Sequence, residues 1–201
     1  MIKIENVSKS FIKGKDVIKN LNLEIKDGEI FGFLGPNGAG KTTTLKMITG
    51  ILNPDKGDIL IDGKSIKNNP IEAKKKFGFV PDSPDMFLRL KGIEYLNFIA
   101  DIYEIDSSVR KDRIENLTRK FEIYDVLGNE LQTYSHGMRQ KIVIAGVLLN
   151  NPKNWILDEP MTGLDPKSAF RFKRNDETTC KTRKLCFFLN TCFRSCWKTM
   201  W

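Results

Sequence analysis

Apolar and polar residues alternate in two segments near the start of the chain, at residues 2–7 (IKIENV) and 21–25 (LNLEI), as they do in strands with one buried face. A turn follows the second segment, and the apolar run at 30–34 predicts a buried strand. We interpret the two alternating segments as antiparallel strands that flank this buried strand. Short apolar runs predict three more strands, at 58–63, 77–80 and 155–158.

Helical spacing of apolar residues predicts the remaining secondary structure. One segment, from 92 to 103, is apolar almost all the way round, which is typical of a helix that is either buried or holds a partner in a groove. The predicted helices cover residues 41–50, 70–76, 92–103, 107–121 and 135–150.

The composition, 201 residues of which 40% are hydrophobic, suits one domain of ordinary size. A net charge of +8 is compatible with nucleic-acid binding, but the lysines are scattered and no aromatic residues alternate with them as base stacking requires. We therefore expect no nucleic-acid partner. The chain has no signal peptide and no apolar run of about 18 residues, so we expect a soluble, cytoplasmic protein that can still lie against a membrane.

Residues 35–42 (GPNGAGKT) fit the phosphate-binding pattern G-x-x-x-x-G-K-S/T in full. A predicted strand precedes the motif and a predicted helix follows, which is the context in which such loops hold polyphosphates through backbone N–H groups. An ordinary glycine-rich turn does not account for this context. Lys41 would reach the β and γ phosphates, and the Thr42 hydroxyl would bind Mg²⁺. The predicted phosphate-binding residues are Gly35, Asn37, Gly38, Ala39, Gly40, Lys41, Thr42 and Thr43.

Two acidic residues, Asp158 and Glu159, follow the apolar run at 155–157. In a chain with a phosphate loop, an aspartate at the end of a buried strand is where a Mg²⁺ ligand belongs. Glu159 is then placed as the catalytic residue that orients and activates a water molecule for attack on the γ-phosphate. An acidic strand end without function is the alternative. The loop alone also leaves kinases, GTPases and ATPases open, because all three classes share it.

Two further segments carry a resemblance to a known family. Residues 134–140 (YSHGMRQ) resemble the signature motif of ATP-binding cassette (ABC) ATPases, and residues 162–165 (TGLD) resemble their D-loop. The order and spacing of all four motifs match the family over residues 1–173. The resemblance implies an α/β fold: a phosphate-loop NTPase (RecA-like) core with a mixed parallel sheet, an antiparallel β subdomain and a helical insertion subdomain over about 86–150.

The resemblance also assigns roles to single residues. It places Phe11 against the adenine ring, although an aromatic residue at a strand end is equally suited to the core. Asp82 stands where the family usually has a glutamine that touches Mg²⁺ and the attacking water, so the chain departs from the family there. Asp165 belongs to the D-loop. The signature residues that would contact ATP bound to a second cassette are Ser135, His136, Gly137 and Met138. Taken alone, Ser135 is equally typical of a helix N-cap.

The function that the resemblance implies is that of an ATP-binding and ATP-hydrolysing subunit of a membrane transporter, most similar around the signature to exporters. Two such cassettes would pair head to tail beneath transmembrane permease subunits, on the inner face of the cell membrane, with ATP and Mg²⁺ bound. One alternative is a soluble ABC ATPase of translation or DNA repair, in which we would expect a second cassette or a coiled-coil insertion. The other is a truncated cassette that does not hydrolyse ATP.

Residues 174–201 differ abruptly from the rest of the chain, since all four cysteines and two of the three tryptophans lie there. The cysteine spacing does not fit a structural zinc site, and disulfides are not expected in the cytoplasm. Family members have a histidine in this region that contacts the γ-phosphate, but the one histidine of this chain, His136, lies in the signature.

We interpret this segment as an aberrant tail that is out of frame. A/T-rich codons chosen for residues 174–197 and read one base later can spell EMMRQHARQGNSVFFSTHVLEVAG, which resembles the missing helix, strand and histidine. Residues 185–189 (LCFFL) are apolar enough to imitate that strand. Because the residues around them were not selected to cover a sheet edge, we expect lower stability and a tendency to aggregate.

Overall fold

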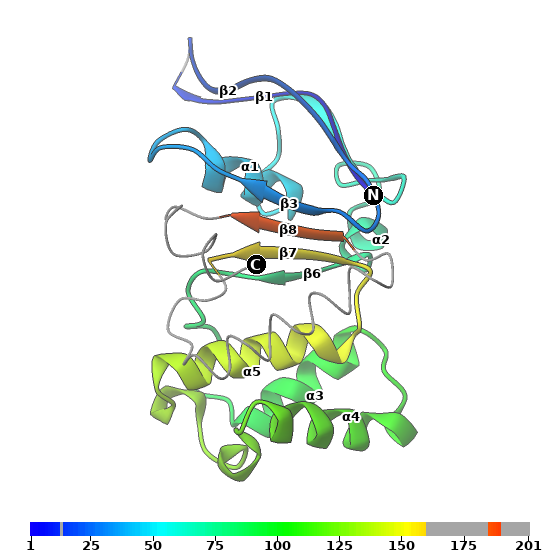
Figure 1. Ribbon diagram of the computed structural model, residues 1–201, viewed down its shortest axis with the longest axis vertical. Helices are drawn as coiled ribbons and strands as arrows, with labels where there is room; N and C mark the ends of the chain where they lie inside the picture. The colour runs from blue at the N-terminus through cyan, green and yellow to red at the C-terminus, as the bar shows by residue number, and fades with distance from the viewer. Residues whose placement is uncertain (13, 160–184, 190–201) are drawn as a thin grey trace. The chain divides into compact units, whose positions relative to one another are not determined.

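The computed structural model describes residues 1–12, 14–159 and 185–189, which fall into two compact units (Figure 1). The described part of the first unit comprises residues 1–12, 14–79, 153–159 and 185–189, and that of the second comprises residues 80–152. The phosphate-loop motif and the acidic pair thus belong to the first unit, whereas the signature segment belongs to the second.

One sheet of the first unit is antiparallel and has the strand order β2-β1-β4-β5. β1 and β2 form a long hairpin, and β1 pairs with β4 on its other side. Residues 2–7 and 21–25 therefore pair with each other in this sheet and do not flank the strand at 30–33, which corrects our prediction. Alternation showed that each strand buries one face, but not which strand it pairs with. The strands are β1 (Ile2–Ile12), β2 (Lys15–Ile25), β4 (Lys56–Ile61) and β5 (Lys64–Ser65).

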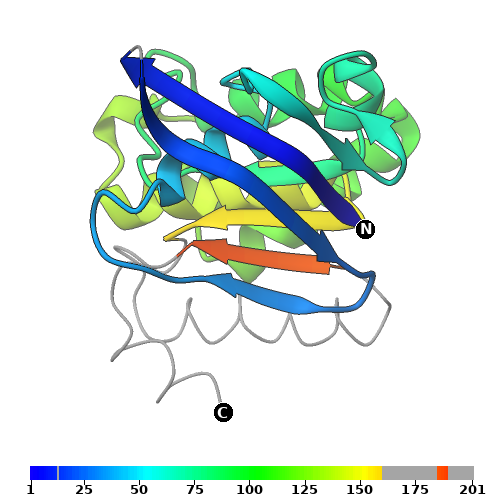
Figure 2. The same cartoon turned by 90° about the horizontal axis from the view of Figure 1, so that it is seen from above.

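The second sheet has the strand order β3-β8-β7-β6. β8 (Leu185–Leu189) lies between β3 (Ile30–Phe33) and β7 (Asn154–Asp158) and is parallel to both (Figures 1 and 2). The segment LCFFL thus forms a strand beside β7, as expected, but in the interior of the sheet instead of at an edge. The fourth strand is β6 (Phe77–Val80).

An aliphatic core joins the two sheets of the first unit through α1 (Lys41–Ile48), which contacts both β2 and β8. Ile2, Ile4 and Val7 of β1 point into this core, because their exposed fractions are close to zero. A short helix, α2 (Pro70–Lys74), adds Ala73. Residues of this core include Ile2, Ile4, Val7, Ile25, Leu45, Met47, Ile48, Ile59, Ile61 and Ile156.

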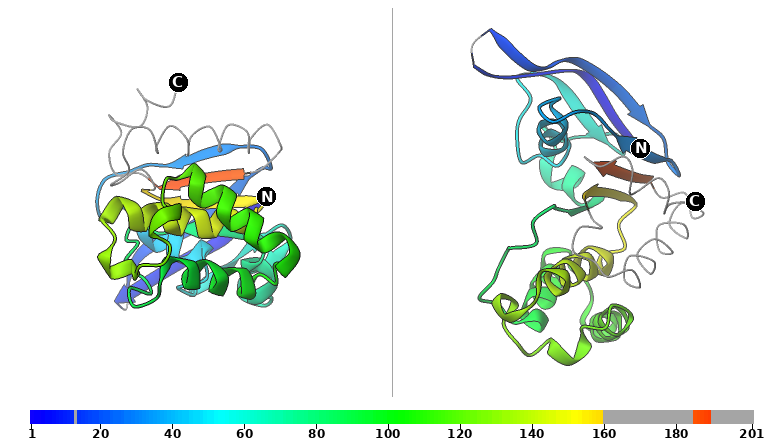
Figure 3. Two further views of the ribbon diagram at one scale, coloured as in Figure 1. Left: turned by 90° about the horizontal axis from the view of Figure 1, so that it is seen from below. Right: turned by 60° about the vertical axis from the view of Figure 1, so that its left-hand side comes forward.

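The second unit is helical. Both α3 (Gly92–Ile102) and α4 (Ser107–Lys120) contact α5 (His136–Leu149), and the three helices are drawn in green to yellow in Figure 3. Their bounds agree with the predicted helices to within a residue or two. Two short 3₁₀ turns, η1 (Tyr124–Val126) and η2 (Leu131–Thr133), lie in the connection between α4 and α5.

The helix predicted to be apolar almost all the way round is α3. The other described residues bury only some of its apolar side chains. Tyr95, Leu96 and Ala100 are buried, whereas Phe98 is 40% exposed and Ile102 is 49% exposed. The helix therefore contributes to the core of its unit and also presents apolar side chains outward. Among the described residues, no helix has both the length and the apolar character needed to cross a membrane.

The interior position of β8 predicts that the tail sequence controls stability. An interior strand hydrogen-bonds on two sides, so a poorly suited sequence weakens two ladders at once. We expect a chain in which EMMRQHARQGNSVFFSTHVLEVAG replaces residues 174–197 to be more stable by at least about 1 kcal/mol, the size of a typical single-substitution effect. Urea-unfolding curves measure the difference. A replaced chain that is no more stable would contradict the interpretation of the tail as out of frame.

Candidate nucleotide site

The glycine-rich loop connects the end of β3 to the start of α1. Gly40, the residue before the helix, provides no side-chain cap, and α1 has no acidic residue in its first turn. The first N–H groups of the helix therefore have no side-chain acceptor from the cap, and the helix dipole adds partial positive charge at the same place. Such a helix start is suited to bind a phosphate group.

Lys41 is only 5% exposed, and its side chain folds back over the loop. Its Nζ donates to the carbonyl oxygens of Gly35, at 2.7 Å, and Pro36, at 2.9 Å. Both acceptors are neutral, so these contacts place the ammonium group at the loop without cancelling its charge. Thr42 follows on the exposed side of the helix start, where its hydroxyl is accessible to a ligand. Thr43 is half-buried in the same turn.

The acidic pair lies at the same edge of the parallel sheet as the loop. Phe33, the last residue of β3, and Asp158, the last residue of β7, are both register partners of Leu189 in β8. Because neighbouring strands lie about 4.8 Å apart, the backbones of Phe33 and Asp158 are about 10 Å apart. This edge is formed by the carboxyl ends of parallel strands, where α/β proteins bind ligands.

The chain changes direction at the acidic pair. Asp158 is 7% exposed, and the half-buried Glu159 has a φ of 45°, in the left-handed region that residues other than glycine rarely adopt. Such a conformation costs roughly 1–3 kcal/mol and occurs preferentially at functional sites.

The start of β7 is held by residues that no motif in the sequence singled out. The Nδ2 atom of the fully buried Asn154 donates to Asp62 Oδ2 at 3.1 Å and to the Lys76 carbonyl oxygen at 2.8 Å. Lys153 pairs with Asp27 at 2.8 Å, and its hydrogen bond lowers the pKa of that carboxyl group. The signal in the sequence is the polar residue Asn154 directly before the apolar run at 155–157, because a buried amide needs hydrogen-bond partners. Its partners, 78 and 92 positions away, become apparent only in the fold.

Phe11 lies near the end of β1 and is 62% exposed. This exposure excludes the alternative in which Phe11 belongs to the core. The Lys9 ammonium group lies 5.8 Å from the ring centroid, so the ring is in contact with a cation and otherwise largely accessible to solvent. Its place against an adenine ring stays a prediction.

The signature residues form the start of α5 in the second unit. Ser135 is the N-cap, and its Oγ accepts a hydrogen bond from the Met138 N–H at 3.3 Å. Ser135 and His136 are exposed, and Gly137 is half-buried. The N-cap role predicted for Ser135 is thus present, and it leaves the residue accessible to an anion at the helix start.

The other predicted site residues are distributed as follows. Asp82 lies in the second unit and is exposed, and its Oδ1 accepts a hydrogen bond from the Ser83 N–H at 2.8 Å. Asp165 lies outside the described residues. Of the four cysteines, Cys186 lies in β8, and Cys180, Cys192 and Cys196 lie outside the described residues.

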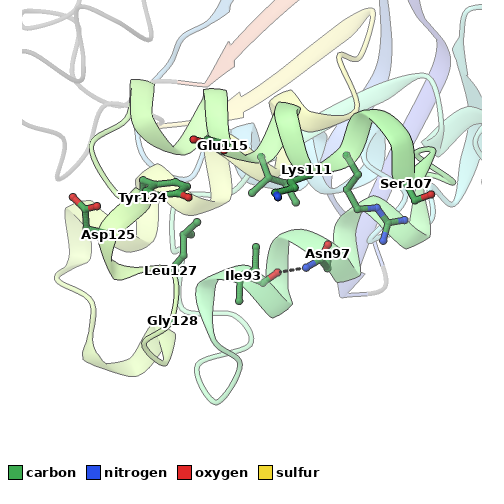
Figure 4. Close-up of a pocket in the computed structure, with 11 residues that line it drawn as sticks. Ile93, Asn97, Ser107, Lys111, Glu115, Tyr124, Asp125, Leu127 and Gly128 are labelled. Carbon is green, nitrogen blue, oxygen red and sulfur yellow. Dashed lines mark hydrogen bonds between the residues drawn. The ribbon is translucent and has the colours of Figure 1, made fainter.

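The second unit also contains a cavity of about 670 Å³ between α3, α4 and η1 (Figure 4). Side chains of both charges line it, among them Arg110, Lys111, Glu115 and Asp125. No residue predicted to bind nucleotide lines this cavity, so it is separate from the candidate site.

The two inner glycines of the loop have the same φ of 83° but different surroundings. A Cβ atom at Gly40 would lie 2.3 Å from Ile18 Cδ1, whereas no heavy atom lies within 4 Å of a Cβ at Gly38. We expect Gly38→Ala to lower the free energy of unfolding by about 1–2 kcal/mol through left-handed strain alone. Gly40→Ala should cost more, because strain and steric overlap add. Urea unfolding compares the two variants, and equal losses would contradict the close packing of the hairpin on the loop.

Comparison with known proteins places these motifs in one family. A family model described as ABC transporter matches residues 18–162, which include the loop, the signature and the acidic pair. The uncharacterized ABC transporter ATP-binding protein YhcH of Bacillus subtilis is 40% identical over 83% of this chain and 53% of its own length. The linearmycin resistance ATP-binding protein LnrL of the same organism is 35% identical over 84% and 54%, respectively. The chain thus spans about half the length of these two relatives.

A further relative and two solved structures are also ATP-binding proteins of ABC transporters or ABC cassettes. The lipopolysaccharide export system ATP-binding protein LptB of Escherichia coli is 38% identical over 85% of this chain and 71% of its own length. An ATP-binding subunit of an ABC transporter superimposes with a TM-score of 0.87 at 27% identity, covering 96% of this chain and 80% of that one. The cassette MJ0796, in a dimeric post-hydrolysis state bound to ADP and Pi, gives 0.83 at 25% identity, covering 94% and 88%. The chain belongs to the ABC transporter family of ATP-binding proteins.

Proposed function

We propose that this chain binds and hydrolyses ATP and that the hydrolysis powers a membrane transporter. The observation that carries the proposal is the register of the parallel sheet, in which Phe33 and Asp158 flank the same residue of β8. The phosphate loop and the acidic pair are thereby about 10 Å apart at the backbone, a separation that the side chains and a triphosphate together can span.

In this proposal each part of the site has a separate task. The N–H groups at the start of α1 and the ammonium group of Lys41 hold the β and γ phosphates. The accessible Thr42 hydroxyl and the Asp158 carboxylate are hard oxygen ligands that would hold Mg²⁺, which supplies charge neutralisation on the triphosphate when bound. Glu159 orients a water molecule and accepts its proton as the oxygen attacks the γ phosphorus, and ADP is the leaving group. For Asp82, whose carboxylate is exposed in the second unit, a role near Mg²⁺ or that water is proposed from the family resemblance alone.

Head-to-tail pairing with a second cassette is the second part of the proposal. The exposed start of α5, with Ser135 and the helix dipole, is suited to contact the γ-phosphate of ATP held by a partner cassette. His136, Gly137 and Met138 belong to the same turn, and Asp165 would lie in the D-loop of that interface. The dimeric structure of MJ0796 supports this arrangement by family likeness.

Transmembrane permease subunits are the third part. Three exposed apolar side chains gather around α3: Phe87, 46% exposed, lies with its ring centroid 5.4 Å from that of Phe98, and Ile102 is 49% exposed. An apolar surface of this kind suits a cytoplasmic helix of a permease, which would place the chain on the inner face of the cell membrane. The similarity to LnrL, a linearmycin resistance protein, and to LptB, a lipopolysaccharide export protein, favours an exporter.

A second candidate function is that of a cassette that binds ATP without hydrolysing it. The observation that favours it is the sequence after residue 136, which contains no histidine to contact the γ-phosphate. Under this second candidate function, the residues after 173 are an out-of-frame tail. Resequencing of the gene should then find the family's strand and histidine encoded in the neighbouring reading frame.

Glu159→Gln should separate binding from hydrolysis. The amide keeps the size of the side chain but cannot accept a proton, so we expect kcat to fall by at least about 100-fold while ATP affinity changes little. Lys41→Ala is the matched control that should lose binding. Phosphate release and fluorescent-nucleotide binding measure the two properties, and unchanged hydrolysis in Glu159→Gln would contradict its role. The ATPase rate of a frame-restored chain is measured in the same assay. If it is no higher than that of the present chain, the claim that the tail impairs hydrolysis is contradicted.

Phe11→Ala should weaken ATP binding. Stacking of a base on an aromatic ring contributes about 1–3 kcal/mol, so we expect the Kd for ATP to rise by about tenfold or more. Ile12→Ala is the control, because the neighbouring Ile12 is 67% exposed and has no aromatic ring. Equal effects of the two substitutions on ATP affinity would show that Phe11 does not stack on the base.

A further inference from the structure

One arginine in the second unit contacts two functional segments at once. Arg139, in the first turn of α5, donates from Nη1 to Asp85 Oδ1 and from Nε to the carbonyl oxygen of Tyr134, the latter at 3.1 Å. Tyr134 immediately precedes the N-cap Ser135, and Asp85 lies three residues after Asp82. A single guanidinium group thus bridges the start of the signature helix and the segment that contains Asp82.

The two ends of this bridge are themselves held by hydrogen bonds. Tyr134 is 2% exposed, and its hydroxyl donates to the Val126 carbonyl oxygen at 2.6 Å. At the other end, Asp85 Oδ2 accepts from the Ser83 hydroxyl at 3.4 Å, and the Ser83 N–H donates to Asp82 Oδ1 at 2.8 Å. Hydrogen bonds therefore run without interruption from the Asp82 carboxylate to the residue before the signature serine.

The charge of Arg139 at the start of α5 requires a nearby negative charge, and Asp85 provides it. A cation in the first turn of a helix opposes the helix dipole, and α5 has no acidic residue in its first turn to compensate. Asp85 supplies the missing negative charge from outside the helix. The Arg139 side chain is 23% exposed and that of Asp85 is 48% exposed, so the pair lies at the surface with its guanidinium end half-buried. A guanidinium fork can make both contacts at once, whereas the single ammonium group of a lysine is a point charge that does not match this geometry.

We propose that Arg139 is a positioning residue that couples segment 82–85 to the orientation of Ser135. The inference rests on the proposed function, in which Asp82 acts near Mg²⁺ and Ser135 contacts ATP of a second cassette. A shift of Asp82 is transmitted through Asp85 and Arg139 to the backbone that carries Ser135. Arg139 thereby affects the pairing of cassettes without contacting nucleotide.

Hydrogen exchange on the free chain tests the coupling without any nucleotide. Asp85→Asn keeps the side-chain size but removes the charge, and Arg139→Lys keeps the charge but not the fork. In both variants we expect the Met138 and Arg139 amides, whose N–H groups donate to Ser135, to exchange about 3- to 10-fold faster, as the loss of one hydrogen bond predicts. The control is Arg119→Gln, which removes the exposed Arg119–Glu115 pair of α4 and should leave these amides unchanged. Unchanged exchange at the start of α5 in both variants would overturn the proposal.

ATP-dependent dimer formation in a Glu159→Gln background gives the second measurement. We expect Asp85→Asn and Arg139→Lys each to weaken dimerisation about 5- to 10-fold in sedimentation analysis, with ATP affinity of the monomer changed less than about twofold. The double variant should be no worse than either single variant, because both break one link. Variants that dimerise as well as their parent refute the inference alone. A parent that forms no dimer refutes the proposed pairing instead, and the exchange result still decides the role of Arg139.

Discussion

The parallel hydrogen-bond ladders on the two sides of β8 are the constraint on which the candidate site depends. Leu189 pairs with Phe33 on one side and with Asp158 on the other, so the distance between the phosphate loop and the acidic pair equals two strand spacings. The backbone geometry of the sheet sets this distance, and the side chains of the loop and of the acidic pair extend into the space between them. A segment of unusual composition can occupy this position because the ladders form between backbone groups, and an interior strand needs apolar residues more than it needs particular ones.

Two helix starts in the chain are suited to anions, and their charges are compensated differently. In α1, the ammonium group of Lys41 donates to two neutral carbonyl oxygens among the described residues, and these contacts do not cancel its charge. In α5, Arg139 is neutralised by Asp85, and the helix start relies on Ser135 and the dipole. This difference agrees with the proposed roles, since the first helix would bind ATP within its own cassette and the second would meet ATP only when cassettes pair.

The strand that carries the acidic pair is held tightly at one end and strained at the other. A buried amide such as that of Asn154 must be hydrogen-bonded, and its contacts with Asp62 and the Lys76 carbonyl satisfy this requirement while fixing where β7 begins. At the far end, the left-handed conformation of Glu159 is unfavourable by itself and persists because the rest of the strand is held. The carboxylates are therefore presented from a rigid element.

The sequence by itself determined the local elements and the family. The loop at 35–42, the helices α3, α4 and α5 and the apolar strand before Asp158 all depend on residues a few positions apart, through side-chain periodicity and glycine chemistry. The order of four motifs was enough to recognise an ABC ATPase. Only the tertiary structure decided which strands share a sheet, that residues 185–189 lie in its interior, and that Arg139 meets Asp85 across 54 positions. The physical reason is that alternation shows that a strand buries one face but does not specify which strand lies beside it. In the same way, the identity of a charged residue does not specify which distant residue folding brings close to it.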